Sequence, residues 1–319
     1  MTVEEAIAGV RAGERRAIGR AISLVEAAGE EGRRVAAALH PETGGAWRVG
    51  VTGAPGVGKS TLLGALITRL RASGRRVAVV SVDPTSPFTR GAVLGDRIRL
   101  ADHFLDPGVF IRSMASRGHR GGLAEATADA MLVLDAAGFD VILVETVGAG
   151  QSEVEVQALT ETVVLALMPG GGDGVQAIKA GVMEIPDVLA VTKADHPGSS
   201  RMASELRNAL SLAPSGPWTP PVVPVVAPDG TGVAELWRAV EEHRAFLGEE
   251  GRLRARRREG LARQLRTLAA DRLSRRLAGA APPEAVGALV DEVLDRRLDP
   301  AAAVDRLLAR AGLGDGAAP

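Results

Sequence analysis

Residues 53–61 read G-A-P-G-V-G-K-S-T and match the pattern G-x-x-x-x-G-K-[ST] in full. The segment W-R-V-G-V-T at 47–52 before them reads as a strand and residues 60–73 after them as a helix, which is the context that this pattern requires. The glycines permit a backbone turn whose N–H groups point at phosphate oxygens, and the helix N-terminus adds its positive end. We therefore predict a binding loop for a nucleoside triphosphate; the alternative is a glycine-rich turn between a strand and a helix.

Two side chains of this loop have specific predicted roles. Lys59 is expected to reach the β- and γ-phosphates, and Ser60 to give its hydroxyl to Mg²⁺. Lysine occurs only at positions 59, 179 and 193, whereas arginine is abundant, so each lysine is a candidate for a role that needs a compact ammonium. The alternative is chance survival at neutral positions. The predicted nucleotide-binding residues of the loop are Gly53, Ala54, Pro55, Gly56, Val57, Gly58, Lys59, Ser60 and Thr61.

Strand-like and helix-like segments alternate from Trp47 onward. Apolar runs such as R-V-A-V-V-S-V and D-V-I-L-V-E, separated by helical stretches, are typical of a mainly parallel sheet with helices on both faces. Residues 3–40 read as short amphipathic helices, and the chain is helical again from about residue 230. We predict an α/β protein with an N-terminal helical extension at 1–45, a phosphate-binding α/β domain at 46–247 and a helical segment at 248–319.

The composition limits the classes of function. The net charge of −1 argues against a bulk attraction to nucleic acid or an anionic membrane, and no apolar run approaches the roughly 20 residues of a membrane span. Residues 251–278 are rich in arginine, but no aromatic residue lies among them to stack on bases, so we expect a solvated amphipathic helix or a dimer arm. The absence of cysteine excludes disulfides and thiolate metal sites and fits a cytoplasmic protein.

Three acidic residues are candidates for holding Mg²⁺ or the attacking water. Asp83 and Glu145 each close an apolar strand, and Asp96 lies in the loop G-A-V-L-G-D-R. Mg²⁺ takes oxygen ligands, and P-loop enzymes place an acid at a strand end beside the phosphate loop, although each acid alone is as compatible with a helix cap or a turn. Gly148 is predicted to let a backbone N–H approach the γ-phosphate. The predicted metal site is Ser60, Asp83, Asp96 and Glu145, and the predicted catalytic residues are Lys59, Asp83, Asp96 and Glu145.

Residues 191–195 read V-T-K-A-D at the end of an apolar run. A guanine-reading loop is usually written Asn-Lys-x-Asp, and Thr192 stands in the Asn position. An ionised Asp195 can accept both N1–H and N2–H of guanine, whereas adenine offers an acceptor at N1, so Asp195 is predicted to select guanine. Lys193 is predicted to lay its stem along the base, and Thr192 to supply one hydrogen bond where an Asn has two donors. The alternative is an ordinary turn at the end of a strand.

Five motifs follow one another in the chain: V-T-G-A-P-G-V-G-K-S-T, V-D-P-T-S-P, G-A-V-L-G-D-R-I-R-L, V-E-T-V-G-A-G-Q-S-E and M-P-G-G-G-D-G-V-Q-A-I-K-A-G. Together they resemble the MeaB/ArgK family, the GTPases that accompany methylmalonyl-CoA mutase. The resemblance implies a SIMIBI-type P-loop GTPase fold with N-terminal helices and a C-terminal helical dimerisation arm. It also implies a homodimer that binds GTP or GDP with Mg²⁺ and hydrolyses GTP slowly alone and faster with its mutase. Through the nucleotide state, such a protein gates adenosylcobalamin delivery to a cobalamin-dependent acyl-CoA mutase and protects or reactivates the mutase.

For single residues, the resemblance implies Lys59 on phosphate, Lys193 and Asp195 on guanine, Ala227 in the last nucleotide-binding loop, and a switch loop at 170–181 that signals to the partner. The chain departs from the family pattern at Thr192 and at Val226, where Ser is common. Loss of one hydrogen bond at Thr192 costs on the order of 1 kcal/mol, so we expect weaker GTP binding with the purine choice unchanged.

Three other functions remain open from the sequence. A metal-delivery GTPase is a weak alternative because the chain has no cysteine and its five histidines are scattered. A P-loop ATPase or small-molecule kinase, including one of transport metabolism, is opposed by T-K-A-D. A non-catalytic nucleotide-binding adaptor is opposed by Lys59, Asp83 and Glu145.

Overall fold

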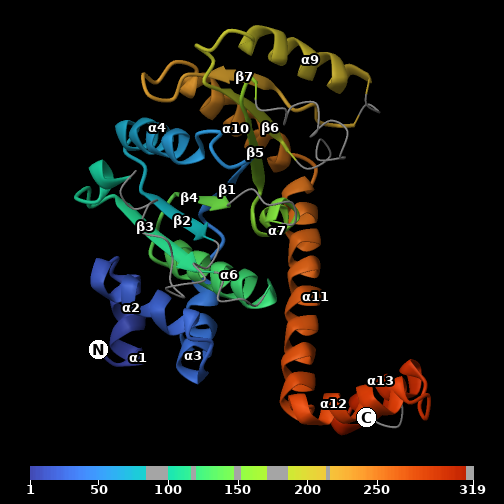
Figure 1. Ribbon diagram of the computed structural model, residues 1–319. Coiled ribbons are helices and arrows are strands. Elements are labelled where there is room, and N and C mark those ends of the chain that lie inside the picture. The colour runs from blue at the N-terminus through green and yellow to red at the C-terminus, as the bar shows by residue number, and fades with distance from the viewer. Residues whose placement is uncertain (84–99, 116–119, 147–151, 171–185, 213–215, 314–319) are drawn as a thin grey trace. The chain divides into compact units, whose positions relative to one another are not determined.

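The computed structural model describes residues 1–83, 100–115, 120–146, 152–170, 186–212 and 216–313 (Figure 1). Within these ranges, seven strands form one sheet in the order β3-β2-β4-β1-β5-β6-β7, and every pairing is parallel. The prediction of a mainly parallel α/β sheet is therefore confirmed. The strands are β1 (Trp47–Thr52), β2 (Val77–Asp83), β3 (Val109–Ala115), β4 (Val141–Thr146), β5 (Thr162–Leu167), β6 (Val188–Thr192) and β7 (Val222–Val225).

Helices cover both faces of this sheet, as the continuous apolar strands predict. Side chains alternate between the faces, so Val77 and Val79 pack with α4 and α10, whereas Ala78 and Val80 pack with α6. The covering helices of the first face are α4 (Lys59–Ala72) and α10 (Val233–Gly248), and those of the second are α6 (Arg120–Ala136), α7 (Ser152–Leu159) and α9 (Ser199–Leu212).

Three N-terminal helices pack against α6 and extend the core of the second face. Thr2 and Glu5 form a reciprocal capping box at the start of the first of them. Residues such as Val10, Ile18, Ile22 and Val35 are buried, which explains the amphipathic pattern of this part of the sequence. The helices are α1 (Val3–Arg11), α2 (Arg15–Glu26) and α3 (Glu30–Leu39), followed by the short η1 (His40–Glu42); a second short helix, η2 (Ala101–His103), precedes β3.

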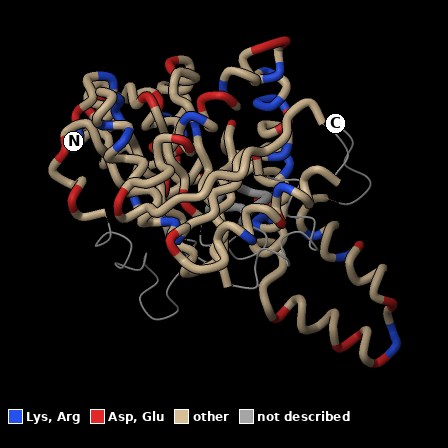
Figure 2. Tube along the Cα trace, turned by 90° about the horizontal axis from the view of Figure 1, so that it is seen from above, with Lys and Arg blue, Asp and Glu red and all other residues tan. Residues whose placement is uncertain are grey.

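By packing, the chain divides into two compact units, Met1–Gln264 and Leu265–Pro319. The second unit contains the end of α11 (Arg252–Ala280) together with α12 (Pro283–Leu294) and α13 (Pro300–Arg310). The segment boundaries 1–45, 46–247 and 248–319 stay a prediction. Basic and acidic residues are interspersed along the chain (Figure 2). No helix in the described ranges is long and apolar enough to span a bilayer.

Buried polar groups hold the start of α11 to the amino edge of the sheet. Asp187, just before β6, accepts the N–H of Val163 at 2.8 Å and a guanidinium N–H of Arg256 at 2.9 Å. His243 of α10 lies between this carboxylate, 3.3 Å from its Nε2, and the Thr162 hydroxyl, 2.9 Å from its Nδ1. The order hydroxyl–imidazole–carboxylate is that of a nucleophilic triad, but Thr162 has 0% exposure, so no substrate can reach it.

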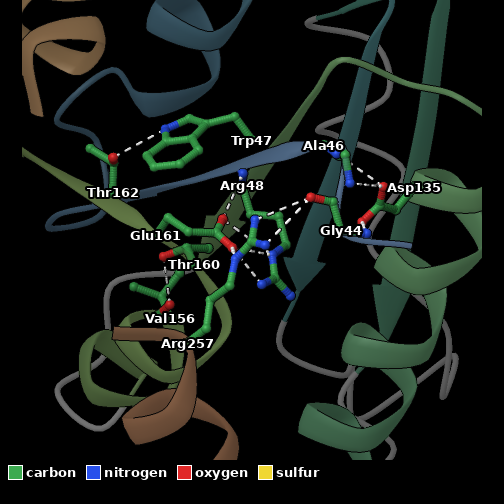
Figure 3. A network of polar contacts seen from close by, with 11 residues as sticks. Gly44, Ala46, Trp47, Arg48, Asp135, Val156, Thr160, Glu161, Thr162 and Arg257 are labelled. Carbon is green, nitrogen blue, oxygen red and sulfur yellow. Dashed lines mark hydrogen bonds and ion pairs between the residues drawn. The ribbon is translucent and has the colours of Figure 1, made fainter. Parts of the chain in front are cut away.

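A second buried carboxylate holds the next arginine of α11 (Figure 3). Glu161, with 1% exposure, accepts from the Nε of Arg257 at 3.0 Å and from the backbone N and side chain of Arg48. Neighbouring Asp135 accepts the backbone N–H groups of the Gly44–Ala46 turn. Consecutive arginines of α11 thus pair with carboxylates that precede the adjacent strands β5 and β6. Buried pairs of this kind are costly to break from one side.

The pH dependence of stability tests the Asp187–His243 pair. Burial raises the pKa of Asp187 from 3.8 to about 6 and, together with Arg256, lowers the pKa of His243 from 6.5 to about 4. Asp187 therefore contributes stability below pH 3.8 that is lost as the pH rises through 6, whereas His243 contributes stability above pH 6.5 that is lost as the pH falls through 4. The two contributions oppose each other in between.

We expect the unfolding free energy of His243→Gln, relative to that of wild type, to decrease as the pH rises from 4 to 6, because only the Asp187 contribution remains. For Asp187→Asn, the same difference should increase as the pH rises over this window. Urea denaturation at closely spaced pH values measures both slopes. Three parallel curves would contradict the assignment.

Candidate functional site

The predicted nucleotide-binding residues gather at the carboxyl edge of the sheet. Because all strands are parallel, the loops that follow β1, β4, β6 and β7 leave the sheet on the same side. The 53–58 loop follows the central β1, with Glu145 on the neighbouring β4 and the 192–195 segment two strands away at the end of β6. Ala227 follows β7 and is half-buried. The fold thus brings these four parts of the prediction to one edge.

The phosphate loop requires glycine for two different reasons. A Cβ on Gly53 would lie 2.3 Å from the Ala166 carbonyl oxygen, so only glycine lets β1 end this close to β5. Gly56 and Gly58 have φ values of +79° and +98°, which other residues rarely adopt. Gly58 directly precedes α4, whose N-terminus therefore opens toward the loop. These are the conformations that an inward-facing row of backbone N–H groups needs.

Lys59 lies over its own loop. Its Nζ donates to the carbonyl oxygens of Gly53 at 2.7 Å and Ala54 at 3.0 Å, and the residue is buried. The ammonium therefore reaches the concave side of the loop on a stem that packs within the protein. A phosphate in the loop would offer this cation anionic oxygens in place of neutral carbonyls.

Ser60 and Glu145 form a buried pair beside the loop. The Ser60 hydroxyl donates to Oε1 of Glu145 at 2.8 Å, and Ser81 of β2 donates to Oε2 at 3.4 Å. A hydroxyl and a carboxylate are oxygen donors of the kind that Mg²⁺ takes, so this pair fits the ion. Asp83 ends β2, but its side chain, Asp96 and Gly148 lie outside the described residues, as does most of the 170–181 loop. The described residues alone contain no cluster of three or more potential metal-binding His, Cys, Asp or Glu side chains.

Thr192 connects the end of β6, where the sequence predicts base reading, to the phosphate loop. Its hydroxyl lies 2.7 Å from the Val57 carbonyl oxygen and 3.0 Å from that of Leu167, with 2% of the residue exposed. A hydroxyl has one proton, and both acceptors here belong to the protein. Thr192 can therefore tether the loops as an Asn would, but no proton remains for a purine.

Lys193 and Asp195 are exposed at the surface beside Thr192. Lys193 has a φ of +50°, and its Nζ donates to the Gly56 carbonyl at 3.0 Å and contacts the Met168 sulfur at 3.3 Å. The ammonium of Lys193 is thus bonded to the backbone of the phosphate loop. Asp195 is exposed, and Ala194 N–H between them donates to the Val225 carbonyl of β7 at 3.1 Å. The segment is thus held on two sides while its carboxylate stays accessible.

Sequence reasoning missed Ser81 and the pair Thr52–Thr146. The two threonine hydroxyls lie 3.1 Å apart at the ends of β1 and β4, buried below the phosphate loop. The sequence signal for such a residue is a polar side chain inside an apolar strand, as in V-A-V-V-S-V-D. A strand residue two positions before a strand-end acid shares its face, so Ser81 could have been found from alternation.

A cavity of about 230 Å³ lies at the opposite edge of the sheet. Its lining includes Arg48, Glu161 and Arg257, which are tied to one another, and the exposed Leu261 of α11. Arg48 and Glu161 stand at the starts of β1 and β5, whereas the phosphate loop follows the end of β1. This cavity is therefore separate from the candidate nucleotide site.

A phosphate loop on the central strand with a Lys-x-Asp segment two strands away is the arrangement of a P-loop GTPase, and comparison with known proteins gives the same class. The chain belongs to the MeaB family, described as methylmalonyl Co-A mutase-associated GTPases, whose family model matches residues 18–282. The resemblance found in the sequence is thereby confirmed.

Relatives and a solved structure agree over most of the chain. It is 46% identical over 310 residues to a putative GTPase of Pyrococcus abyssi, covering 96% of both chains. It is 34% identical over 277 residues to the mitochondrial methylmalonic aciduria type A homolog of Mus musculus, covering 80% of this chain and 66% of that protein. The crystal structure of a LAO/AO transport system kinase matches with a TM-score of 0.73 and 28% identity, covering 96% of both chains.

Removing the Thr192 hydroxyl tests the tether. Thr192→Val keeps the shape but leaves the Val57 and Leu167 carbonyls without this donor, so the unfolding free energy should fall by about 1–3 kcal/mol. GDP affinity should fall as well, because the phosphate loop loses a fixed point. Thr192→Ser keeps the hydroxyl and is the matched control. Equal stability and GDP affinity in the Val and Ser variants, measured by denaturation and calorimetry, would contradict the tether.

Proposed function

We propose that this protein is a GTP-binding and GTP-hydrolysing chaperone for a cobalamin-dependent acyl-CoA mutase, with methylmalonyl-CoA mutase as the first candidate. In this proposal the nucleotide state gates delivery of adenosylcobalamin to the mutase and protects or reactivates it. The observation that carries the proposal is the match of a mutase-associated GTPase family to most of the chain. The intact phosphate loop and Lys-x-Asp segment support it, because a switch of this kind needs both.

The proposed chemistry assigns the phosphates to the 53–58 loop and to Lys59. Backbone N–H groups and the ammonium would stabilise charge on the transferred phosphoryl group, which is the main task in this reaction. The Ser60–Glu145 pair, with Asp83 and Asp96, is proposed to hold Mg²⁺ and to orient the attacking water. Mg²⁺, when bound, neutralises charge on the phosphate oxygens. Slow turnover in the absence of a partner is expected if the mutase completes the site.

The proposed base is guanine. An exposed Asp195 carboxylate beside a tethered Lys193 suits the paired donors of guanine and mismatches adenine. A P-loop ATPase or small-molecule kinase remains the second candidate. The solved relative that is called a LAO/AO transport system kinase favours it by name, although the T-K-A-D segment here speaks for GTP.

A homodimer is proposed through the C-terminal unit. Val286, Val290 and Leu294 recur every four residues along α12 and are 37%, 49% and 73% exposed. Residues four apart form one stripe on a helix, and an apolar stripe open to water favours association with another apolar surface. A second copy of the chain offers the same stripe and is the proposed partner.

Asp195→Asn tests the base assignment. An amide cannot accept both guanine donors in the way a carboxylate does, so we expect the ratio of GTP to ATP affinity to fall by at least about tenfold. Competition binding with a fluorescent GDP analogue measures both affinities. Lys59→Ala, which should abolish triphosphate binding, is the negative control. An unchanged ratio in Asp195→Asn would show that the base is not read by this residue.

Purification with candidate mutases tests the proposed partner. We expect a cobalamin-dependent acyl-CoA mutase to co-elute with the chain in the presence of nucleotide and to raise its GTP turnover. Light scattering on the same column gives the mass of the free chain, where a monomer would contradict the homodimer. Failure of methylmalonyl-, isobutyryl- and ethylmalonyl-CoA mutases alike to bind or to stimulate turnover would contradict the chaperone role.

A further inference from the structure

A row of polar side chains crosses the sheet below the phosphate loop. Glu145 of β4, Ser81 of β2 and Ser113 of β3 are register partners on adjacent parallel strands. Register partners in a parallel sheet point to the same face. Ser81 shares its face of β2 with Val77 and Val79, which pack with α4. Ser60 of α4 completes the row through its hydrogen bond to Glu145. The row therefore leads from the phosphate loop across β4 and β2 to β3.

All four side chains of this row are buried. Ser60, Ser81, Ser113 and Glu145 have exposures of 5%, 2%, 9% and 6%. A buried hydroxyl costs free energy unless it is hydrogen-bonded, and the rest of β2 before Asp83 consists of Ala and Val. A serine in this strand is thus an exception that needs a partner.

The two strand serines differ in what they contact. Ser81 donates to Oε2 of Glu145 at 3.4 Å, while Ser113 finds no hydrogen-bond partner within the described part of the chain. Ser113 is thus a buried hydroxyl in register with Ser81 that makes no hydrogen bond to the residues of the candidate site in the described part of the chain. The contact with Glu145 is what separates Ser81 from it.

We propose that Ser81 is a positioning residue for GTP hydrolysis, which acts by holding the carboxylate of Glu145. This inference rests on the proposed GTPase site. The terminal torsion of a glutamate is broad, so hydrogen bonds to both oxygens restrict the plane of the carboxylate more than a bond to Oε1 alone. Ser60 contacts Oε1 at 2.8 Å and Ser81 contacts Oε2 at 3.4 Å, so both oxygens have a hydroxyl partner. The Ser60 hydroxyl then keeps donating its hydrogen bond to Glu145, and the lone pairs of the Ser60 oxygen face away from the carboxylate.

This positioning should affect Mg²⁺ binding and the rate of hydrolysis more than nucleotide affinity. A hydroxyl whose proton is committed to a carboxylate presents only its lone pairs to a cation, which is what Mg²⁺ requires of it. Loss of Ser81 would remove the contact at Oε2 and leave the orientation of Glu145, and of Ser60 bonded to it, less restricted. The backbone contacts that the 53–58 loop is proposed to make to phosphate would not involve Ser81, so nucleotide affinity without Mg²⁺ should be unaffected.

Three serine variants test the inference. Ser81→Ala should lower the single-turnover rate of GTP hydrolysis about tenfold, the size expected for one hydrogen bond to a charged group. It should also raise severalfold the Mg²⁺ concentration for half-maximal binding of a fluorescent GDP analogue, with affinity in EDTA unchanged. Ser81→Thr keeps the hydroxyl and should restore both values. Ser113→Ala, the same change one strand further on the same face, should match wild type.

The outcomes are distinguishable from a failure of the proposed function. If wild type shows no Mg²⁺-dependent binding of the GDP analogue, the GTPase site itself is wrong. If wild type binds and Ser81→Ala behaves like it in both measurements, Ser81 has no positioning role while the GTPase site stands. Equal losses in Ser81→Ala and Ser113→Ala would assign the effect to general repacking and overturn the inference. Thermal unfolding of each variant shows that the losses come from folded protein.

Discussion

The hydrogen bond from the Thr192 hydroxyl to the Val57 carbonyl joins two loops that one nucleotide would have to touch at once. The phosphate loop at the end of β1 and the 192–195 segment at the end of β6 are separated in the sheet by strand β5, and this bond joins them directly. The same hydroxyl lies within reach of the Leu167 carbonyl at the end of β5, so one buried atom links three strand ends. The distance between the phosphate loop and the 192–195 segment depends on this contact. Lys193, bonded to Gly56, repeats the connection at the surface.

The strands β5 and β6 carry polar anchors at both ends. At their carboxyl ends lie the Leu167 carbonyl and Thr192, and just before their amino ends lie Glu161 and Asp187. The latter two bind Arg257 and Arg256, which are adjacent in α11. Neighbouring residues of a helix point about 100° apart, and the two carboxylates suit this divergence because they precede neighbouring strands. The first turns of α11 are therefore fixed in rotation as well as in position.

The sequence predicts the framework because its signals are local. Continuous Val and Ala runs separated by helices predict the parallel sheet, and the glycine pattern predicts the loop that Gly53, Gly56 and Gly58 form. The sequence predicts one hydrogen bond from Thr192 but does not indicate that the carbonyl oxygens of Val57 and Leu167 are its acceptors. The Asp187–His243–Arg256 cluster could not be found in this way, because its members come from distant segments and each alone resembles a surface residue. Ser81 falls between these cases: the alternation that reveals it is local, but its acceptor is on another strand.

The positions of the tryptophans determine what the intrinsic fluorescence of the chain reports. It has three tryptophans and no tyrosine, so its intrinsic emission comes from indole alone. Trp47 donates to Thr162 and Trp218 to the Asp187 carbonyl, while Trp237 is buried in α10. Trp47 and Trp218 thus donate to residues just before or at the start of β5 and β6, at the edge of the sheet opposite the phosphate loop. A change in emission on adding nucleotide would therefore have its source in the protein interior and not in stacking of the base on an indole.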